Sequence, residues 1–183
     1  NFAPVIDVNS NPKNPIINNR SFGEDPYRVA EKGLDYMRGM QDNHVLACAK
    51  HFPGHGDTDK DSHKTLPIIN HNKDRLNKIE LIPFKKLINN GLGSVMTAHL
   101  NIPVLENDSN LPSSLSKNVV DSLLKNKLGF QGLCITDALN MNAVSDLYDP
   151  GDVDLKALLA GNDVLLFSEN VPKAIQRIKD AIK

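Results

Sequence analysis

The sequence predicts an α/β fold built on a parallel sheet, and three observations lead to this prediction. The apolar runs are short, rich in β-branched residues and free of alternating polar positions, as expected of strands that are covered on both faces. Segments with helical periodicity lie between these runs and carry start and stop signals. Strands and helices alternate along the chain, which is typical of right-handed βαβ units.

The expected elements follow one another at regular intervals. Strands are predicted over residues 2–6, 45–49, 94–98, 133–136 and 163–167. Asp25 and Pro26 form an N-cap and first-turn pair for a helix that begins there. Further helices are expected over 73–90, where Pro83 should kink or divide the helix, and over 116–129, 153–160 and 172–182.

Two architectures fit this order of elements, a doubly wound open sheet and part of a (β/α)8 barrel. A complete barrel takes roughly 250 residues and eight strands. The sequence has 183 residues and five predicted strands, the first of which begins almost at residue 1. A barrel would therefore lack its opening strands. No glycine-rich phosphate loop follows any predicted strand, so the usual nucleotide-binding fingerprint of an open sheet is absent.

Composition and charge exclude several classes of protein. With 21 Lys and Arg against 22 Asp and Glu, the net charge of −1 argues against a general basic surface for nucleic acid. No apolar run is long enough for a membrane-spanning helix, and no signal peptide is visible in the first residues. Cys48 and Cys134 lie in apolar runs and are predicted to be buried thiols rather than a disulfide. The compartment, cytoplasmic or exported, stays open.

Polar and titratable residues gather in the segment that follows the second predicted strand. Positions 50–63 read KHFPGHGDTDKDSH, with three histidines and three aspartates. In parallel α/β proteins, loops at the carboxyl ends of strands build the active site. The alternatives are a solvated, turn-rich loop and a metal site. Candidate ligands for a metal are His51, His55 and His63 with Asp57 or Asp61, although Pro53 and Gly54 forbid a helical pair of histidines.

Three further residues stand at comparable positions. Asp137 comes directly after the predicted strand 133–136, where it would either serve chemistry or cap the next helix. His99 follows the strand 94–98 in the same way. Arg20 lies in the loop after the first strand, where an arginine is more often a surface residue or an ion-pair partner than a ligand contact.

Three motifs resemble one known family. The run KHFPGHG at 50–56, continuing to DSH at 61–63 and LP at 66–67, resembles the signature of bacterial β-N-acetylglucosaminidases of glycoside hydrolase family 3. The run NRSFGEDP at 19–26 is similar to the upstream loop of that family. The run ITDAL at 135–139, with Met141, resembles its nucleophile strand. The motifs occur in the family's order between residue 1 and about residue 168.

The resemblance implies a (β/α)8 barrel domain over residues 1–183 that lacks its first strands and holds about strands four to eight. It also implies a retaining hydrolase, without a metal or other cofactor, that removes terminal β-linked N-acetylglucosamine from cell-wall muropeptides or chitin-type oligosaccharides. Retaining enzymes form a covalent glycosyl-enzyme that water then releases.

The resemblance also assigns roles to residues. The nucleophile carries over onto Asp137, the acid/base onto His63, and the partner that orients this histidine onto Asp61. A histidine suits acid/base work because its unperturbed pKa of about 6.5 lies near the working pH. The family's sugar-binding residues carry over onto Arg20, Lys50 and His51, which would donate hydrogen bonds to sugar hydroxyls.

Several expectations accompany this hypothesis. Because strands are missing, both sheet edges would be open, and we expect another chain to cover them or the chain to self-associate. Two related alternatives are an N-acetylglucosaminide phosphorylase and a non-catalytic carbohydrate-binding remnant of a barrel. Phosphorolysis enters because a neutral histidine repels phosphate less than a carboxylate does.

Overall fold

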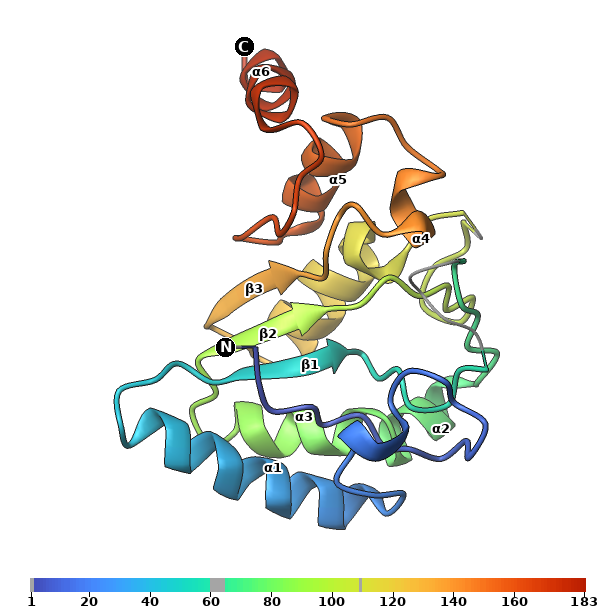
Figure 1. Ribbon diagram of the computed structural model, residues 1–183, viewed down its shortest axis with the longest axis vertical. Helices are drawn as coiled ribbons and strands as arrows, with labels where there is room; N and C mark the ends of the chain where they lie inside the picture. The colour runs from blue at the N-terminus through green and yellow to red at the C-terminus, as the bar shows by residue number, and fades with distance from the viewer. Residues whose placement is uncertain (1, 60–64, 109) are drawn as a thin grey trace.

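The sheet has three parallel strands in sequential order. The computed structural model describes residues 2–59, 65–108 and 110–183. Within them, β1 (Cys48–Phe52) pairs with β2 (Ser94–Thr97), and β2 pairs with β3 (Leu133–Thr136) (Figure 1). Each strand therefore lies beside the next one along the chain, which is the winding of a (β/α)8 barrel rather than that of a doubly wound sheet with a switch point.

The prediction of five strands is wrong for the two outer segments. In segment 2–6, Val5 makes a single parallel bridge to Lys50, and in segment 163–167, Val164 makes one to Ile135. Pro4 has no N–H to donate to a ladder. Phe167 has φ +52°, which ends the extended backbone of the second segment. Both segments flank the sheet in barrel order, but neither forms a regular strand.

Strand β1 also lies later in the chain than the hydrophobic pattern predicts. The prediction covered 45–49, whereas the strand is Cys48–Phe52. Val45 and Leu46 are exposed, and Lys50 and His51 belong to the strand. Hydropathy placed the strand too early because Lys50 and His51 interrupt its apolar run.

The predicted helices are present. Helix α1 (Pro26–Gln41) begins where the Asp25 side chain accepts a hydrogen bond from the Arg28 amide, as the N-cap prediction requires. The predicted helix 73–90 is divided into α2 (Lys73–Lys78) and α3 (Leu81–Ile88). Pro83 lies in the first turn of α3, where its missing N–H costs little.

The other predicted helices match η3, a π-type helix (Asn118–Lys127), α5 (Asp152–Ala160) and α6 (Val171–Ala181). The short elements η1 (Asn18–Arg20), η2 (Ser113–Leu115) and α4 (Asn142–Ser145) were not predicted. In the part of the chain that the structure describes, no helix combines the length and the apolar character needed to cross a membrane.

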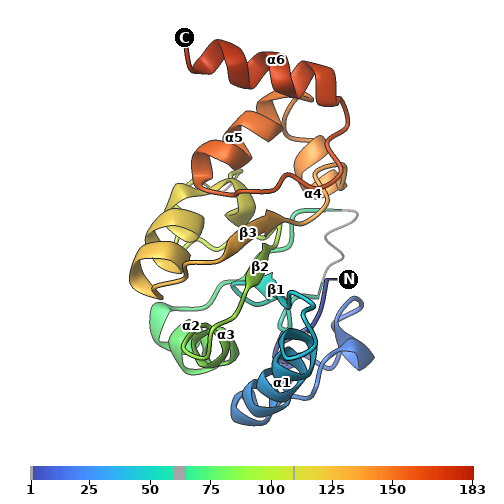
Figure 2. The same ribbon diagram turned by 90° about the vertical axis from the view of Figure 1, so that its left-hand side faces the viewer.

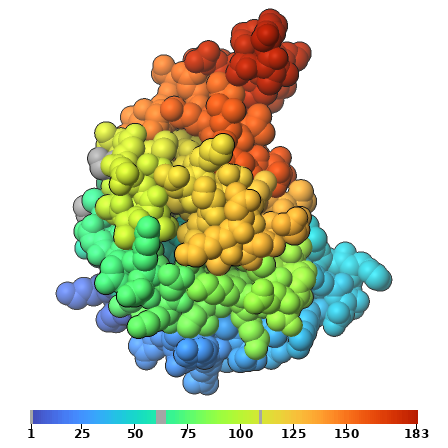
Figure 3. Space-filling model, turned by 180° about the vertical axis from the view of Figure 1, so that it is seen from behind, coloured from blue at the N-terminus to red at the C-terminus, as the bar shows by residue number. Residues whose placement is uncertain are grey.

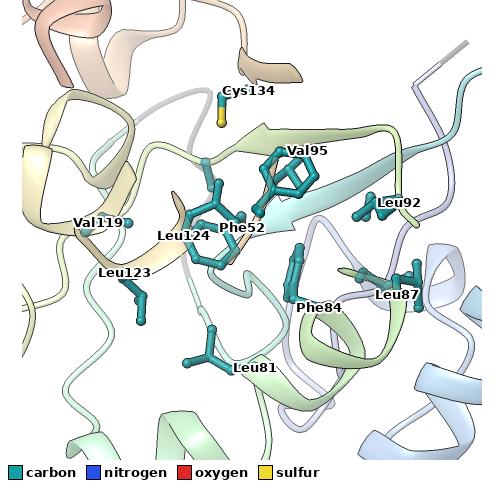
Figure 4. Close-up of a cluster of buried hydrophobic side chains, with 14 of the residues drawn as sticks. Phe52, Leu81, Phe84, Leu87, Leu92, Val95, Val119, Leu123, Leu124 and Cys134 are labelled. Atoms are coloured by element: carbon teal, nitrogen blue, oxygen red, sulfur yellow. The ribbon is translucent and has the colours of Figure 1, made fainter. Parts of the chain in front are cut away.

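Helices α1, α3 and η3 pack against the same face of the sheet (Figure 2). The main core lies between them, and Phe52 of β1 meets Phe84 of α3 edge to face with ring centroids 5.1 Å apart. Figure 4 shows this cluster, in which Val95 and Cys134 come from β2 and β3. Both cysteines are buried free thiols, as predicted.

The opposite face of the sheet carries a smaller layer. Cys48, Met96 and Ile135 form it, one from each strand, and Leu166 packs against them. Seen from behind, α6 projects at one end of the molecule (Figure 3). In α6 only Ala174 is buried. This small layer corresponds to the inside of a barrel, and two of its residues, Met96 and Leu166, also line a pocket.

Candidate functional site

A pocket of about 290 Å³ lies on the inner face of the sheet, toward the carboxyl ends of the strands. The residues that line it come from the first segment, from η1 and the residues before it, from β1 and β2, and from two segments after β3, at 137–138 and 166–167. Its lining consists of Phe2, Ile16, Arg20, Lys50, His51, His55, Met96, Asp137, Ala138, Leu166 and Phe167. Four predicted site residues, Arg20, Lys50, His51 and Asp137, therefore meet in one pocket.

Lys50 and His51 both line this pocket although they are consecutive in β1. Strict alternation would send them to opposite faces. The pairing of β1 with β2 is irregular between Ala49 and Phe52, and such an irregularity re-aims side chains at a strand end. Half-buried Lys50 has a pKa below its ordinary value, first because of burial and then because of the charge of Arg20.

Asp137 begins the segment after β3, and its Oδ1 accepts a hydrogen bond from the Ala138 amide at 2.9 Å. Burial raises the pKa of Asp137. The lowering effects are larger in sum and come from His51 and His99 when protonated, from the Ala138 amide and from Lys50. The pKa of Asp137 therefore lies below its ordinary value. Asp137 is therefore ionised at neutral pH. It caps no helix, since α4 begins later and its N-cap is Met141.

Asp7 is a site residue that the sequence analysis missed. It is fully buried, and its Oδ2 lies 2.7 Å from Nδ1 of His51 while its Oδ1 accepts the His55 amide at 2.7 Å. The His51 amide also donates to both oxygens, at 3.1 and 3.2 Å. Burial raises the pKa of Asp7, but His51 and His55 lower it more, and the carboxyl stays below its ordinary range. Its signal was available, because Asp7 directly follows the first predicted strand, as Asp137 follows another.

Arg20 approaches the same histidine from the pocket side. Its Nη2 lies 3.5 Å from Nε2 of His51, and its Nη1 donates to the Ile16 carbonyl at 3.3 Å. Arg20 belongs to the 3-10 helix η1, in the loop that follows the first segment. The Arg20 side chain lines the pocket and is at the same time exposed to solvent.

His99 is buried beside the pocket, below Asp137. Its Nε2 lies 3.0 Å from the Ala138 carbonyl, and its Nδ1 lies 2.6 Å from the Ser114 hydroxyl. A carbonyl only accepts, so Nε2 donates and the hydroxyl donates to Nδ1. His99 thus ties the backbone next to Asp137 to helix η2, which supports the position of that carboxylate.

The glycines of the KHFPGHG run serve close packing. A Cβ at Gly56 would lie 1.8 Å from the Val8 carbonyl oxygen, and one at Gly54, which has φ +132°, would lie 2.8 Å from Cβ of Glu80. Between them, His55 is buried with its Nδ1 2.8 Å from the Thr58 hydroxyl. Burial lowers the pKa of His55. The contact of Gly56 with Val8 holds the end of the run against the first segment, and the contact of Gly54 with Glu80 holds it against the start of α3.

A polar cluster lies next to the motif. Nε2 of His71 forms a hydrogen bond with the Asp57 carboxylate, and Arg75 of α2 lies 3.8 Å from Asp57. Arg75 also contacts Glu80 at 3.3 Å and donates to the Ser10 hydroxyl at 3.1 Å. Glu80 is 2% exposed, and burial raises its pKa despite the nearby arginine. The cluster joins residues before and after the segment 58–70.

Asp61 and His63, the predicted partner and acid/base, lie outside the described residues. The metal alternative also involves these residues, because its proposed ligands are His51, His55 and His63 with Asp57 or Asp61. Within residues 2–59, 65–108 and 110–183, no group of three or more His, Cys, Asp or Glu side chains is arranged to hold a metal ion. In that same part of the chain, His51 and His55 turn their Nδ1 atoms to Asp7 and Thr58.

Comparison with known proteins identifies the family. The sequence profile described as "Glycosyl hydrolase family 3 N terminal domain" matches residues 1–183, the whole chain. The chain belongs to glycosyl hydrolase family 3. The resemblance found in the three motifs is thereby confirmed, and the sheet is an open part of the barrel domain of this family.

Three similar proteins illustrate the relationship. Beta-hexosaminidase A of Pseudoalteromonas piscicida is 41% identical over 98% of this chain and 31% of its own length. The structure of a glycoside hydrolase family 3 beta-N-acetylglucosaminidase from Paenibacillus sp. is 44% identical, with a TM-score of 0.95 over 99% of this chain and 35% of that one. Beta-glucoside phosphorylase BglX is 28% identical, with a TM-score of 0.93 over 99% of this chain and 34% of that one. The present chain thus spans about a third of the length of these relatives.

Proposed function

We propose that this family 3 protein is a β-N-acetylhexosaminidase that removes terminal β-linked N-acetylglucosamine with retention of configuration. Its substrates would be cell-wall muropeptides or chitin-type oligosaccharides. The observation that carries the proposal is the convergence of an ionised Asp137 with Arg20, Lys50 and His51 in one pocket. The names of the relatives from Pseudoalteromonas and Paenibacillus support it.

In the first step, the Asp137 carboxylate attacks the anomeric carbon and forms a glycosyl ester, while His63 gives a proton to the departing glycosidic oxygen. In the second step, His63 takes a proton from water, and the water oxygen attacks the anomeric carbon and releases Asp137. Asp61 would accept a hydrogen bond from the other ring nitrogen of His63 and stabilise its charged form.

The pocket itself suits a single sugar. Its volume of about 290 Å³ lies at the small end of ligand pockets, which span about 300–1,000 Å³. Apolar side chains of Met96 and Leu166 form one wall, and the cations of Arg20 and Lys50 supply hydrogen-bond donors for hydroxyl groups.

The test is release of nitrophenol from the β-N-acetylglucosaminide, with the plain β-glucoside as the comparison substrate. We expect turnover of the first substrate, complete loss in Asp137→Ala, and a larger loss in His63→Ala than in Asp61→Ala. Azide added to Asp137→Ala should restore nitrophenol release and give the α-glycosyl azide, because azide replaces the missing nucleophile. Turnover that survives Asp137→Ala would exclude Asp137 as the nucleophile.

A slow fluorinated substrate offers a direct view of the intermediate. We expect mass spectrometry to find one sugar attached to the peptide that contains Asp137, and none in Asp137→Asn. A label on another carboxylate would reassign the nucleophile.

Phosphorolysis is a second candidate, favoured by the likeness to Beta-glucoside phosphorylase BglX. Phosphate would then replace water in the second step and give a sugar 1-phosphate. Comparing products in phosphate and in a neutral buffer without phosphate separates the two reactions. Sugar binding without any turnover would instead favour the non-catalytic alternative.

A further inference from the structure

Asp7 and His51 form a buried pair whose chemistry goes beyond the proposed catalytic residues. Asp7 is 0% exposed and His51 is 6% exposed. Both Asp7 oxygens receive N–H groups, Oδ1 from the His55 amide at 2.7 Å and Oδ2 close to His51 Nδ1 at 2.7 Å. Backbone N–H groups donate to both oxygens, from His55 to Oδ1 and from His51 to Oδ1 and Oδ2, and the pKa of Asp7 lies below its ordinary value. The carboxyl is therefore an ionised acceptor, which makes Nδ1 of His51 the donor in their contact.

The opposite nitrogen of the ring faces a group that only donates. Nη2 of Arg20 lies 3.5 Å from Nε2 of His51, and a guanidinium has five N–H donors and no acceptor. A proton on Nε2 would point at these N–H groups. The carboxylate on one side and the guanidinium on the other thus favour the same tautomer.

We propose that Asp7 is a positioning residue that holds His51 in the tautomer protonated on Nδ1 and presents Nε2 to the pocket as a hydrogen-bond acceptor. Arg20 and Lys50 can only donate, whereas a sugar hydroxyl both donates and accepts. Nε2 of His51 would therefore accept a hydrogen bond, either from a sugar hydroxyl or from Arg20. This acceptor role is the reverse of the donor role that the sequence suggested for His51.

The effect of this tautomer on sugar binding rests on the proposed function, but the tautomer itself does not. It can be read without any ligand, from long-range ¹H–¹⁵N spectra of protein labelled at its six histidines, recorded over a series of pH values up to the point at which the signals of His51 stop shifting. The signals of His51 are identified by their loss in His51→Gln. We expect the proton of the native ring on Nδ1.

The variant Asp7→Asn tests the cause. Its amide oxygen can still accept the His55 N–H, which turns the NH₂ group toward Nδ1 of His51. Because an NH₂ group donates, Nδ1 must then accept, and the proton should move to Nε2. Asp154→Asn is the matched control, since Asp154 is also 0% exposed and accepts a backbone N–H, from Gly151 at 3.0 Å, in a different part of the chain.

The proposal is overturned if the native ring carries its proton on Nε2, or if Asp7→Asn leaves the proton on Nδ1. Should Asp7→Asn fail to fold, the native spectrum alone still decides. A second measurement is the Kd for N-acetylglucosamine, which we expect to rise roughly tenfold in Asp7→Asn, as for one lost hydrogen bond, and to stay unchanged in Asp154→Asn. If the native protein binds no sugar but the His51 ring carries its proton on Nδ1, the proposed function fails and the role of Asp7 stands.

Discussion

The carboxylate of Asp7 lies 2.7 Å from Nδ1 of His51, although the two residues are 44 positions apart in the sequence. Their backbones explain this closeness, since the amide of Ile6, just before Asp7, donates to the carbonyl of Lys50, just before His51, at 2.8 Å. The first segment and β1 therefore lie side by side with Asp7 next to His51. The histidine of one motif is held by a residue outside every motif.

The stability of the fold should depend on pH through Asp7. Its pKa is lower in the folded state than in the unfolded chain, so the stabilisation is complete above the unfolded pKa of about 3.9 and is lost as the pH falls through the folded value. We expect Asp7→Asn to cost about 2 kcal/mol at pH 7, since buried hydrogen bonds to a charged group are lost. Urea unfolding at pH 7 and at pH 3 measures this cost. A cost that is equally large at both values would contradict the prediction.

The charge of Lys50 should help to set the pH at which kcat/KM of the proposed reaction falls on the acidic side. This charge helps to keep the pKa of Asp137 low, after the larger effects of His51, His99 and the Ala138 amide. Removing the charge in Lys50→Met should raise that pKa and move the acidic limb of kcat/KM to higher pH. Lys50→Arg keeps the charge and serves as the control. An acidic limb that stays in place in Lys50→Met would show that Lys50 acts only on the sugar.

Gly56 should not tolerate a side chain. An added Cβ would lie 1.8 Å from the Val8 carbonyl oxygen, and backbone cannot give way as a flexible side chain does. We expect Gly56→Ala to cost more than about 3 kcal/mol, in the range of severe steric damage. Gly39→Ala is the control, because a Cβ there meets nothing within 4 Å. Gly39 lies in the last turn of α1, and its replacement by Ala should not destabilise the helix. Equal denaturation midpoints for the two variants would refute this account.

Arg75 should stabilise the fold mainly through buried Glu80. Without the guanidinium, that carboxylate would be a buried charge without its cation, and we expect Arg75→Met to cost about 3 kcal/mol at pH 7. Burial already raises the pKa of Glu80, so the cost should shrink as the pH falls toward 4 and the carboxyl takes up a proton.

The double variant Arg75→Met/Glu80→Gln provides the test of that coupling. It should recover part of the loss, because it removes the stranded charge. If the double variant is as unstable as the sum of the two single variants, the two residues act independently.

Local patterns predicted most of the helices and the order of the strands. Asp25 and Pro26 marked the start of α1 correctly, because an N-cap hydrogen bond to Arg28 involves residues three apart. The outer strands failed for a reason that is not local. A strand needs a partner, and the segments around Val5 and Val164 each make one bridge only.

The sequence by itself determined the family, through its three motifs, and the start of α1, through an N-cap whose contact lies within a few residues. The family resemblance pointed to Arg20, Lys50, His51 and Asp137, and Asp137 also stands at a predicted strand end, where barrels collect functional groups. Only the tertiary structure decided which residues support them. The carboxylate of Asp7, the contact of His99 with the Ala138 carbonyl and the approach of Gly56 to Val8 depend on distances between segments far apart in the chain. Hydrophobic periodicity records which face of an element is buried, whereas these contacts are set by how neighbouring segments align across the sheet.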